Sequence, residues 1–378
     1  MKKIALLTWF DNNNYGSALQ AFALKHTLDK FGICDVINYK THSDKYKLSD
    51  LKTGENRKII FEKCITKICV VFLKRKYTNY IIEKRKKFVT FFSDYLYLEK
   101  PQLAKSELKK LTNKYDYFVC GSDQVWSPLR YDSSFYLDFA GTKNKISYAP
   151  SFGVDNVKVF DTKTEEIKKN LLDFNNISVR EDSGKNIVKK LIGKDVPVCL
   201  DPTLLLSREE WSDFAKASKK NNAKDYLYCL FLGDYKLHRK SFSDISSLLK
   251  LPVFLHSYNR KDYFSKFNHF NGLGPSEFVN SIKNANFVCT DSFHAAVFSI
   301  IFHKPFVLYK RFSDGDKGSQ NTRVINLLQM LDLSERLDLE VNKKTTKEDL
   351  LNINYQKVDS KLDALREKSF DYLTNALK

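Results

Sequence analysis

The chain contains 378 residues, of which 43% are hydrophobic and 14% aromatic, and its 63 Lys and Arg residues exceed its 45 Asp and Glu residues, for a net charge of +18. This length is typical of two domains, and the 13 Gly and 8 Pro residues are too few for a collagen-like or low-complexity chain. The charge indicates an anionic partner, whether a nucleic acid, a membrane surface or a phosphorylated ligand, unless it reflects only a lysine-rich genomic composition.

Short apolar runs alternate with helical patterns from the N-terminus onward. A helix is predicted over 18–31, and the strands of the first half over 4–9, 36–39, 117–120 and 146–149. The pattern then restarts, with strands predicted over 177–180, 198–200, 226–232, 253–255, 287–290 and 306–309. Such alternation is typical of parallel sheets covered by helices. The sequence therefore predicts an α/β protein with two Rossmann-like lobes.

The lobe boundary is expected in the polar, lysine-rich helix over 162–174. We predict a first lobe over 1–170, on the acceptor side, and a second lobe over 171–345, on the donor side. The last segment, 346–378, has the pattern of a helix that can cross back to the first lobe. Ligands are expected in the cleft between the lobes, because open α/β sheets bind them at the carboxyl ends of their strands.

Residues 57–87 carry eleven Lys and Arg against two Glu, among many apolar positions. We predict a basic helical insertion in the first lobe, over about 57–95. Two interpretations stay open. A basic amphipathic helix can lie on an anionic membrane face, or the insertion can pack its apolar side on the lobe and leave its lysines in water.

The seven cysteines are scattered: Cys34, Cys64, Cys69, Cys120, Cys199, Cys229 and Cys289. Their odd number, mostly apolar neighbours and lack of CxxC spacing predict buried free thiols in a reducing compartment. The N-terminal run MKKIALLTWF has no cleavage site after it, which favours a strand over a signal peptide. No segment approaches the roughly 18 apolar residues of a membrane span. We therefore predict a cytoplasmic protein.

The turn after the first strand contains Asn14, Tyr15, Gly16 and Ser17 and leads into a helix. A strand, a Gly-containing turn and a helix N-terminus together form a pocket of backbone N–H groups that suits an anion. The turn lacks the GxGxxG spacing and the Walker lysine of known phosphate loops. The alternative is an Asn/Gly turn with a serine cap.

Asp123 follows the predicted strand 117–120, where its carboxylate can accept a proton from a sugar hydroxyl. Gln124 and Trp126 come directly after it. As purely structural residues, Asp123 would cap a helix and Trp126 would anchor the core.

Arg180 stands at the end of the strand that is predicted to begin the second lobe. An arginine there suits bidentate binding of a carboxylate or phosphate. The alternative is a salt bridge with Glu181 or Asp182. Asp201 is similarly placed, but it precedes Pro202, and we interpret this pair as turn-forming.

His294 lies between the predicted strand 287–289 and an apolar helix over 297–302. Histidine at such a turn can give and take protons at neutral pH. A polar loop over 310–318, followed by Arg323, brings further cations after the next strand. These cations either complete an anion pocket beside His294 or lie in water. No spacing of His, Cys and Asp indicates a metal site, and no GxSxG motif is present.

Six segments, taken in order, resemble the polysaccharide pyruvyl transferase family: 14–20, 121–126, 148–153, 178–181, 201–203 and 290–294. The resemblance implies a fold similar to the glycosyltransferase B (GT-B) architecture, phosphoenolpyruvate as donor and two hydroxyls of a sugar as acceptor. In the family an arginine and a histidine serve the donor, and the matching positions here are Arg180 and His294. A further cation maps to Arg323. Ala295 stands where many relatives have Gly.

The implied reaction places a pyruvate ketal on a sugar of a bacterial polysaccharide, such as a capsule or exopolysaccharide, or on its lipid-linked precursor. His294 protonates the methylene carbon of the donor, and Asp123 relieves the attacking hydroxyl of its proton. The candidate residues are His294 and Asp123 for catalysis; Arg180, Arg323, Ser292 and Lys317 for the donor; and Asn14, Tyr15, Gly16, Ser17, Gln124 and Trp126 for the acceptor or an anion.

Phosphoenolpyruvate is then a co-substrate, and no cofactor and no nucleic acid are expected. A lipid-diphosphate-linked oligosaccharide as acceptor would suit both the charge and a peripheral contact of 57–87 with the inner face of the cytoplasmic membrane. One alternative is a glycosyltransferase of the same architecture, because two α/β lobes with a basic cleft also suit a nucleotide sugar. Another is a non-catalytic protein that binds anionic surfaces and shows salt-dependent binding without turnover.

Overall fold

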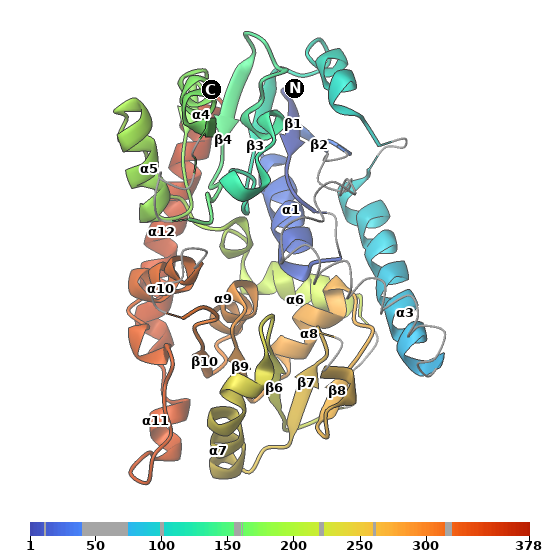
Figure 1. Cartoon of the computed structure of the whole chain (residues 1–378), viewed down its shortest axis with the longest axis vertical. Helices are drawn as coiled ribbons and strands as arrows, with labels where there is room; N and C mark the ends of the chain where they lie inside the picture. Colours follow the sequence, from blue (N-terminus) through green and yellow to red (C-terminus); the bar gives the residue numbers. More distant parts are fainter. Residues whose placement is uncertain are drawn as a thin grey trace.

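The structure is a computed structural model. It describes residues 1–10, 13–39, 75–98, 102–154, 160, 162–218, 223–259, 262–313 and 320–378. These residues form two α/β lobes, one above the other in Figure 1, and each lobe is built on a five-stranded parallel sheet. The two-lobed α/β fold predicted from the sequence is therefore confirmed.

The first sheet has the strand order β2-β1-β3-β4-β5. Its strands are β1 (Lys3–Leu7), β2 (Ile33–Val36), β3 (Tyr117–Cys120), β4 (Asn144–Ser147) and β5 (Asn176–Ile177). The central strands are almost wholly buried and apolar, as expected where helices cover both faces of a parallel sheet. The helices of this lobe are α1 (Tyr15–Leu28), α3 (Arg75–Phe91), α4 (Thr164–Leu172) and α5 (Asp182–Ile192).

Strand β5 corrects the expected lobe boundary at residue 170. It pairs with β4 in the first sheet, where Ser147 lies opposite Ile177, and a further bridge joins Val179 to Val198. The segment that carries Arg180 thus belongs to the first sheet and does not begin the second. A strand of two residues at a sheet edge has no periodicity of its own, so the sequence pattern does not reveal which sheet it joins.

The second sheet has the strand order β10-β9-β6-β7-β8. Its strands are β6 (Leu227–Leu230), β7 (Val253–His256), β8 (Asn268–Phe270), β9 (Phe287–Thr290) and β10 (Phe306–Leu308). The helices of the second half are α6 (Arg208–Lys216), α7 (Arg239–Leu249), α8 (Pro275–Lys283), α9 (Phe293–Ile301), α10 (Asn321–Met330), α11 (Lys347–Leu351) and α12 (Tyr355–Ala376).

Helix α12 runs along both lobes, as its red ribbon shows in Figure 1. Near its start, the Tyr355 hydroxyl donates to the carbonyl oxygen of Lys304 in the second lobe, at 2.5 Å. Near its end, the Tyr372 hydroxyl donates to the carbonyl oxygen of Ser147 in the first lobe, at 2.8 Å. The helix therefore connects the two lobes through hydrogen bonds to each.

Helix α3 extends from the first lobe along the edge of the second (Figure 1). Phe88 and Phe91 bury their rings in the core, and Lys87 bonds Glu277 at 2.9 Å and the carbonyl oxygen of Gly272 at 3.0 Å in the second lobe. Of the predicted basic insertion, 57–74 lie outside the described residues. No helix in the described part of the chain combines the length and apolar character needed to cross a membrane.

Candidate active site

The candidate residues lie in loops that follow β1, β3, β5 and β9. Each sheet is parallel, so the carboxyl ends of its strands share one edge, which is where open α/β folds bind ligands. Between the lobes, Arg180, Asp201, Phe293 and Arg323 are among the residues that line a small pocket. Segments far apart in the sequence thus contribute to one cluster of charged side chains.

Arg180 is 4% exposed and has acidic and hydroxyl partners on one side. Its Nη2 lies 2.8 Å from Asp201 Oδ2 and donates to Ser122 Oγ at 2.7 Å, while Nη1 lies 3.7 Å from Asp123 Oδ1. Its guanidinium carbon is 5.4 Å from the ring centroid of Phe293. Nε and Nη1 have no hydrogen-bond partner in the structure described. This arginine therefore keeps donors available for a planar anion.

His294 is the second residue of α9, at the N-terminal end that faces α1. Its Nε2 lies 3.5 Å from Asp201 Oδ2. The other side of the ring abuts Gly16, where an added Cβ atom would come within 2.1 Å of His294 Nδ1. Only glycine fits there, so the first turns of α1 and α9 meet at this histidine. Two helix N-termini at one point favour negative charge in a ligand.

Asp123 follows β3 and adopts a positive φ of 61°. Ser17 Oγ donates to its Oδ2 at 2.7 Å, and Arg180 and Arg323 face its Oδ1 at 3.7 and 4.0 Å. Burial acts to raise the pKa of Asp123, but the positive charges of Arg180, His294 and Arg323 outweigh it and hold the pKa below its ordinary value. An anionic ligand that neutralises these cations would make the carboxylate a stronger base.

Asp201 is the site residue that the sequence reasoning ranked as structural. Its Oδ1 accepts bonds from the backbone N–H and the hydroxyl of Thr203, at 3.0 and 2.6 Å. Its Oδ2 faces both Arg180 and His294. Burial acts to raise the pKa of Asp201, but Arg180 and His294 outweigh it, so the pKa is lowered. The bridge between Val198 and Val179, which brings Asp201 to Arg180, is long-range and is not visible in the sequence.

Arg323 approaches the cluster from the start of α10. Its Nη2 donates to Gln320 Oε1 at 2.8 Å, and its Nη1 lies 4.0 Å from Asp123. Burial lowers the pKa of Arg323 to about 10, although Asp123 acts in the opposite direction. Arg180 and Arg323 thus converge on one carboxylate from different lobes. Lys317, the other expected cation, lies outside the described residues.

Tyr15 lies between the lobes and packs into their shared core. Its hydroxyl donates to the carbonyl oxygen of Leu273 at 2.8 Å, and it lies 3.1 Å from His256 Nε2. Its ring stacks on Phe278, with centroids 4.7 Å apart. The position explains this tyrosine as a contact between lobes beside the site.

Three other candidates hold backbone or core positions. The Asn14 and Ser292 side chains cap α1 and α9 by accepting from the backbone N–H of Ser17 and Ala295. The Trp126 ring is buried in the first lobe and donates to the carbonyl oxygen of Phe135 at 3.1 Å. The Trp126 contact matches the structural alternative left open for that residue, whereas in the first turn the cap is Asn14 and not the expected serine, because Ser17 lies inside α1.

Gln124 is half-buried and lies against Gly153, where an added Cβ would come within 2.2 Å of its Nε2. That Nε2 has no hydrogen-bond partner in the described part of the molecule. No cluster of three or more His, Cys, Asp or Glu that could hold a metal occurs among the described residues.

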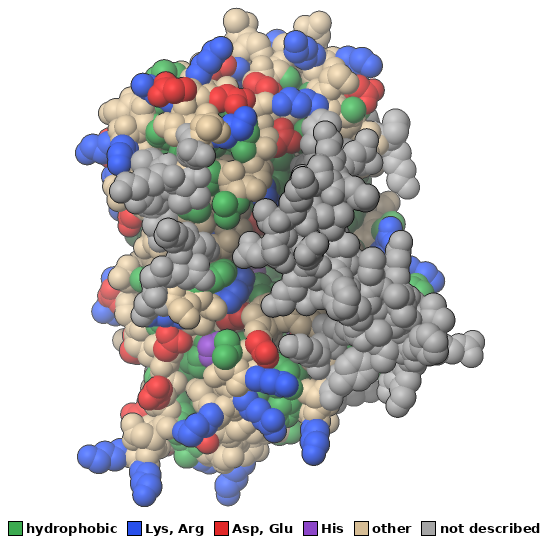
Figure 2. All heavy atoms as spheres, viewed as in Figure 1, with side chains coloured by type: hydrophobic (Ala, Val, Ile, Leu, Met, Phe, Trp, Pro, Cys, Tyr) green, Lys and Arg blue, Asp and Glu red, His purple; other side chains and the backbone are tan. Residues whose placement is uncertain are grey.

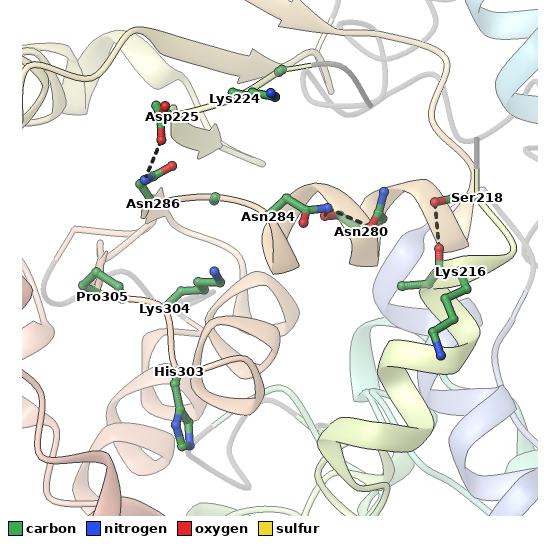
Figure 3. A pocket seen from close by; sticks show the side chains of 13 residues that line it. Lys216, Ser218, Lys224, Asp225, Asn280, Asn284, Asn286, His303, Lys304 and Pro305 are labelled. Carbon is green, nitrogen blue, oxygen red and sulfur yellow. Dashed lines mark hydrogen bonds between the residues drawn. The ribbon is translucent and has the colours of Figure 1, made fainter. Parts of the chain in front are cut away.

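A second, more open pocket lies on the far edge of the second lobe, before the strands begin (Figure 3). Its polar lining includes Lys216, Lys224 and Lys304, and Asn286 Nδ2 bonds Asp225 at 3.3 Å. His294 and the two arginines stand at the opposite, carboxyl edge of the strands. The converging charged groups, and not the volume of a pocket, locate the candidate active site.

Solved structures similar to this chain include two UDP-GlcNAc 2-epimerases and a heptosyltransferase. A UDP-GlcNAc 2-epimerase from Neisseria meningitidis is 11% identical over 98% of this chain and 100% of that chain, with a TM-score of 0.50. One from Rickettsia bellii is 9% identical over 100% and 97%, with a TM-score of 0.49. The E. coli heptosyltransferase WaaC is 10% identical over 87% and 99%, with a TM-score of 0.38. The first likeness, with the two sheets, shows a fold of the GT-B class.

The family is shown by the model for "Polysaccharide pyruvyl transferase", which matches residues 14–311 of this chain. This range includes Asp123, Arg180 and His294, whereas Arg323 lies beyond it. The chain belongs to the polysaccharide pyruvyl transferase family, and the resemblance inferred from the sequence is confirmed. A comparison with curated proteins found no match.

Proposed function

We propose that the protein transfers the enolpyruvyl carbons of phosphoenolpyruvate to two hydroxyls of a sugar and forms a cyclic pyruvate ketal. The observation that carries this proposal is the buried Arg180, which retains unbonded donor atoms beside His294, with Asp201 between the two. The acceptor is a sugar of a bacterial polysaccharide or of its lipid-linked precursor.

The donor has a carboxylate and a phosphate, and the pocket offers two arginines. A guanidinium group binds either anion through paired N–H groups, and burial strengthens that interaction. Arg180 and Arg323 both face Asp123. Binding of the anionic donor would then offset part of the positive charge near Asp123.

His294 is proposed as the general acid. It adds a proton to the methylene carbon of phosphoenolpyruvate, so that positive charge develops on the carbon that carries the phosphate. Asp201 Oδ2 lies 3.5 Å from Nε2 and orients the imidazole. Both helix N-termini at this point stabilise the anionic donor.

The remaining steps use the two hydroxyls of the sugar, and together they conserve atoms and protons. One hydroxyl attacks the cationic carbon and gives up its proton, which Asp123 can accept. The bond from that carbon to the phosphate oxygen then breaks, and the second hydroxyl attacks the same carbon and closes the ring. One proton has been added to the methylene carbon, and one leaves with inorganic phosphate.

The test is acceptor-dependent release of phosphate from phosphoenolpyruvate, measured with galactosides, glucosides and N-acetylhexosaminides while the acceptor mass is followed. His294→Ala should lower turnover by roughly 100- to 10,000-fold, the usual contribution of a general acid. His238→Ala is the matched control, because the His238 ring stacks on Phe231 and Tyr309, which are not residues of the cluster; it should retain activity.

Near-normal turnover of His294→Ala would contradict the assigned role. If no acceptor in the panel causes phosphate release, and the protein instead binds a nucleotide sugar, the glycosyltransferase alternative would be favoured. Salt-dependent binding to anionic surfaces with no turnover of either donor would favour the non-catalytic one.

A further inference from the structure

Helix α3 has two faces of different character. On the inner face, Phe88 and Phe91 are buried. Lys84 Nζ lies 4.4 Å from the ring centroid of Tyr15, and Lys87 pairs with Glu83 and Glu277 at 3.0 and 2.9 Å. The inner cations therefore have partners within the protein.

The outer face of α3 consists of Ile81, Ile82, Arg85, Lys86 and Val89. These positions follow the spacing i, i+1, i+4, i+5 and i+8, which places them on one side of a helix. Ile81, Ile82 and Val89 are 40%, 46% and 56% exposed, and both cations are exposed as well. Large aliphatic side chains and cations thus alternate on a surface that faces away from the lobes.

The cations of the outer face are not neutralised by the described chain. The ion pairs of α3 belong to Lys87, and no described carboxylate pairs with Arg85 or Lys86. Figure 2 shows some blue side chains at the right-hand edge, on the side where Figure 1 places α3. Three branched aliphatic side chains beside cations that no described carboxylate pairs with suit a partner that is both apolar and anionic.

We propose that the outer face of α3 binds the anionic surface of a phospholipid membrane. A basic helix that lies in the membrane plane places its apolar side chains at the boundary of the acyl chains and its cations against the headgroups. A nucleic acid would satisfy Arg85 and Lys86 but would leave the aliphatic residues in water. The net charge of +18 attracts the whole molecule to the same surface.

The arrangement joins the membrane surface to the candidate active site through one helix. Lys84, on the inner face, contacts Tyr15, and the next residue, Gly16, abuts His294. If the proposed function holds, a membrane-bound α3 would present the cleft to an acceptor carried on a lipid. Membrane binding itself does not depend on that function, because it is measured without turnover.

The test is co-sedimentation of the full chain with vesicles of phosphatidylcholine alone or mixed with phosphatidylglycerol. We expect binding only to the mixed vesicles, and weaker binding as salt rises. The double variant Arg85→Glu with Lys86→Glu should bind at least roughly tenfold more weakly, because each cation near an anionic surface contributes separately. The triple variant Ile81→Ser, Ile82→Ser and Val89→Ser should also bind the mixed vesicles more weakly than wild type does.

Helix α4 supplies the matched controls, since it also exposes two adjacent lysines and a leucine. Lys168→Glu with Lys169→Glu, and separately Leu172→Ser, should leave vesicle binding unchanged. Equal losses in the α3 and α4 variants would mean that net charge alone acts, and would overturn the inference. So would wild-type binding by the α3 variants, or retention by duplex DNA with none by vesicles. Unchanged melting temperatures would show that the variants are folded.

Discussion

At the scale of single residues, the contact between Gly16 and His294 is the tightest constraint on the site. A Cβ atom at position 16 would lie 2.1 Å from Nδ1 and 2.6 Å from Cε1 of the ring. The neighbours of the ring leave it little freedom, because the side chain is only 10% exposed and Asp201 lies on its other side. Any side chain at position 16 must therefore displace the histidine.

We expect Gly16→Ala to lower turnover nearly as far as His294→Ala does. It should also lower the free energy of unfolding by about 1–3 kcal/mol, the usual cost of an overpacked site. In a His294→Ala background that stability cost should largely disappear, because the ring is gone. The measurements are phosphate release and urea unfolding of the four proteins in a double-mutant cycle. The same stability cost in both backgrounds would contradict the contact.

The sequence predicted part of this residue-level arrangement. It identified Arg180, His294 and Asp123 as candidates, and the structure brings them together with Arg323. Asp201 was missed because an Asp-Pro pair is typical of turns, and nothing in the spacing reveals what its second carboxylate oxygen faces. A residue's presence in a family motif also does not show whether its side chain binds a ligand or packs in the core, as that of Trp126 does.

At the scale of elements, a buried hydrogen-bond network links α1 to the second sheet. His256, the last residue of β7, lies 3.1 Å from the Tyr15 hydroxyl through Nε2 and 2.5 Å from the Tyr228 hydroxyl through Nδ1. Burial, and then the charge of Lys84, lower the pKa of His256 from its ordinary 6.5 to about 3. The imidazole is therefore neutral in the folded protein at neutral pH.

This network predicts a pH dependence of stability. Between pH 6.5 and 3 the unfolded chain binds a proton at His256 that the folded protein does not, so the free energy of unfolding falls as the pH falls. The contribution is about 1.4 kcal/mol for each pH unit below the ordinary pKa. His256→Gln removes the titration but keeps a polar side chain.

Urea unfolding at several pH values from neutral to mildly acidic checks this expectation. His256→Gln should be no more stable than wild type at neutral pH, and the difference should shrink or reverse in acid. Parallel curves for the two proteins would contradict the lowered pKa of His256.

The elements themselves were largely predictable from period and composition. Continuous apolar runs such as those of β1 and β9 are typical of buried parallel strands, and both are buried here. The exception was β5, two residues long, which the sequence assigned to the wrong lobe. Pairing partners depend on long-range packing, which a local pattern does not contain.

At the scale of the whole molecule, the lobes share one continuous apolar core. A single cluster of buried residues contains Ile4 and Leu19 from the first lobe, Phe298 from the second, and Leu362 and Leu373 from α12. The termini also meet, because Lys2 Nζ donates to the carbonyl oxygen of Leu377. Neither lobe can expose its side of this core without exposing that of the other.

We therefore expect the protein to unfold in one cooperative transition, with equal calorimetric and van't Hoff enthalpies. Tyr355→Phe removes a bond of α12 to the second lobe, and Tyr372→Phe removes one to the first. Each should cost about 1 kcal/mol and lower the same single melting temperature. Tyr97→Phe is the control, because Tyr97 is 71% exposed. Two transitions, with each substitution moving only one, would mean that the lobes unfold independently and that α12 does not couple them.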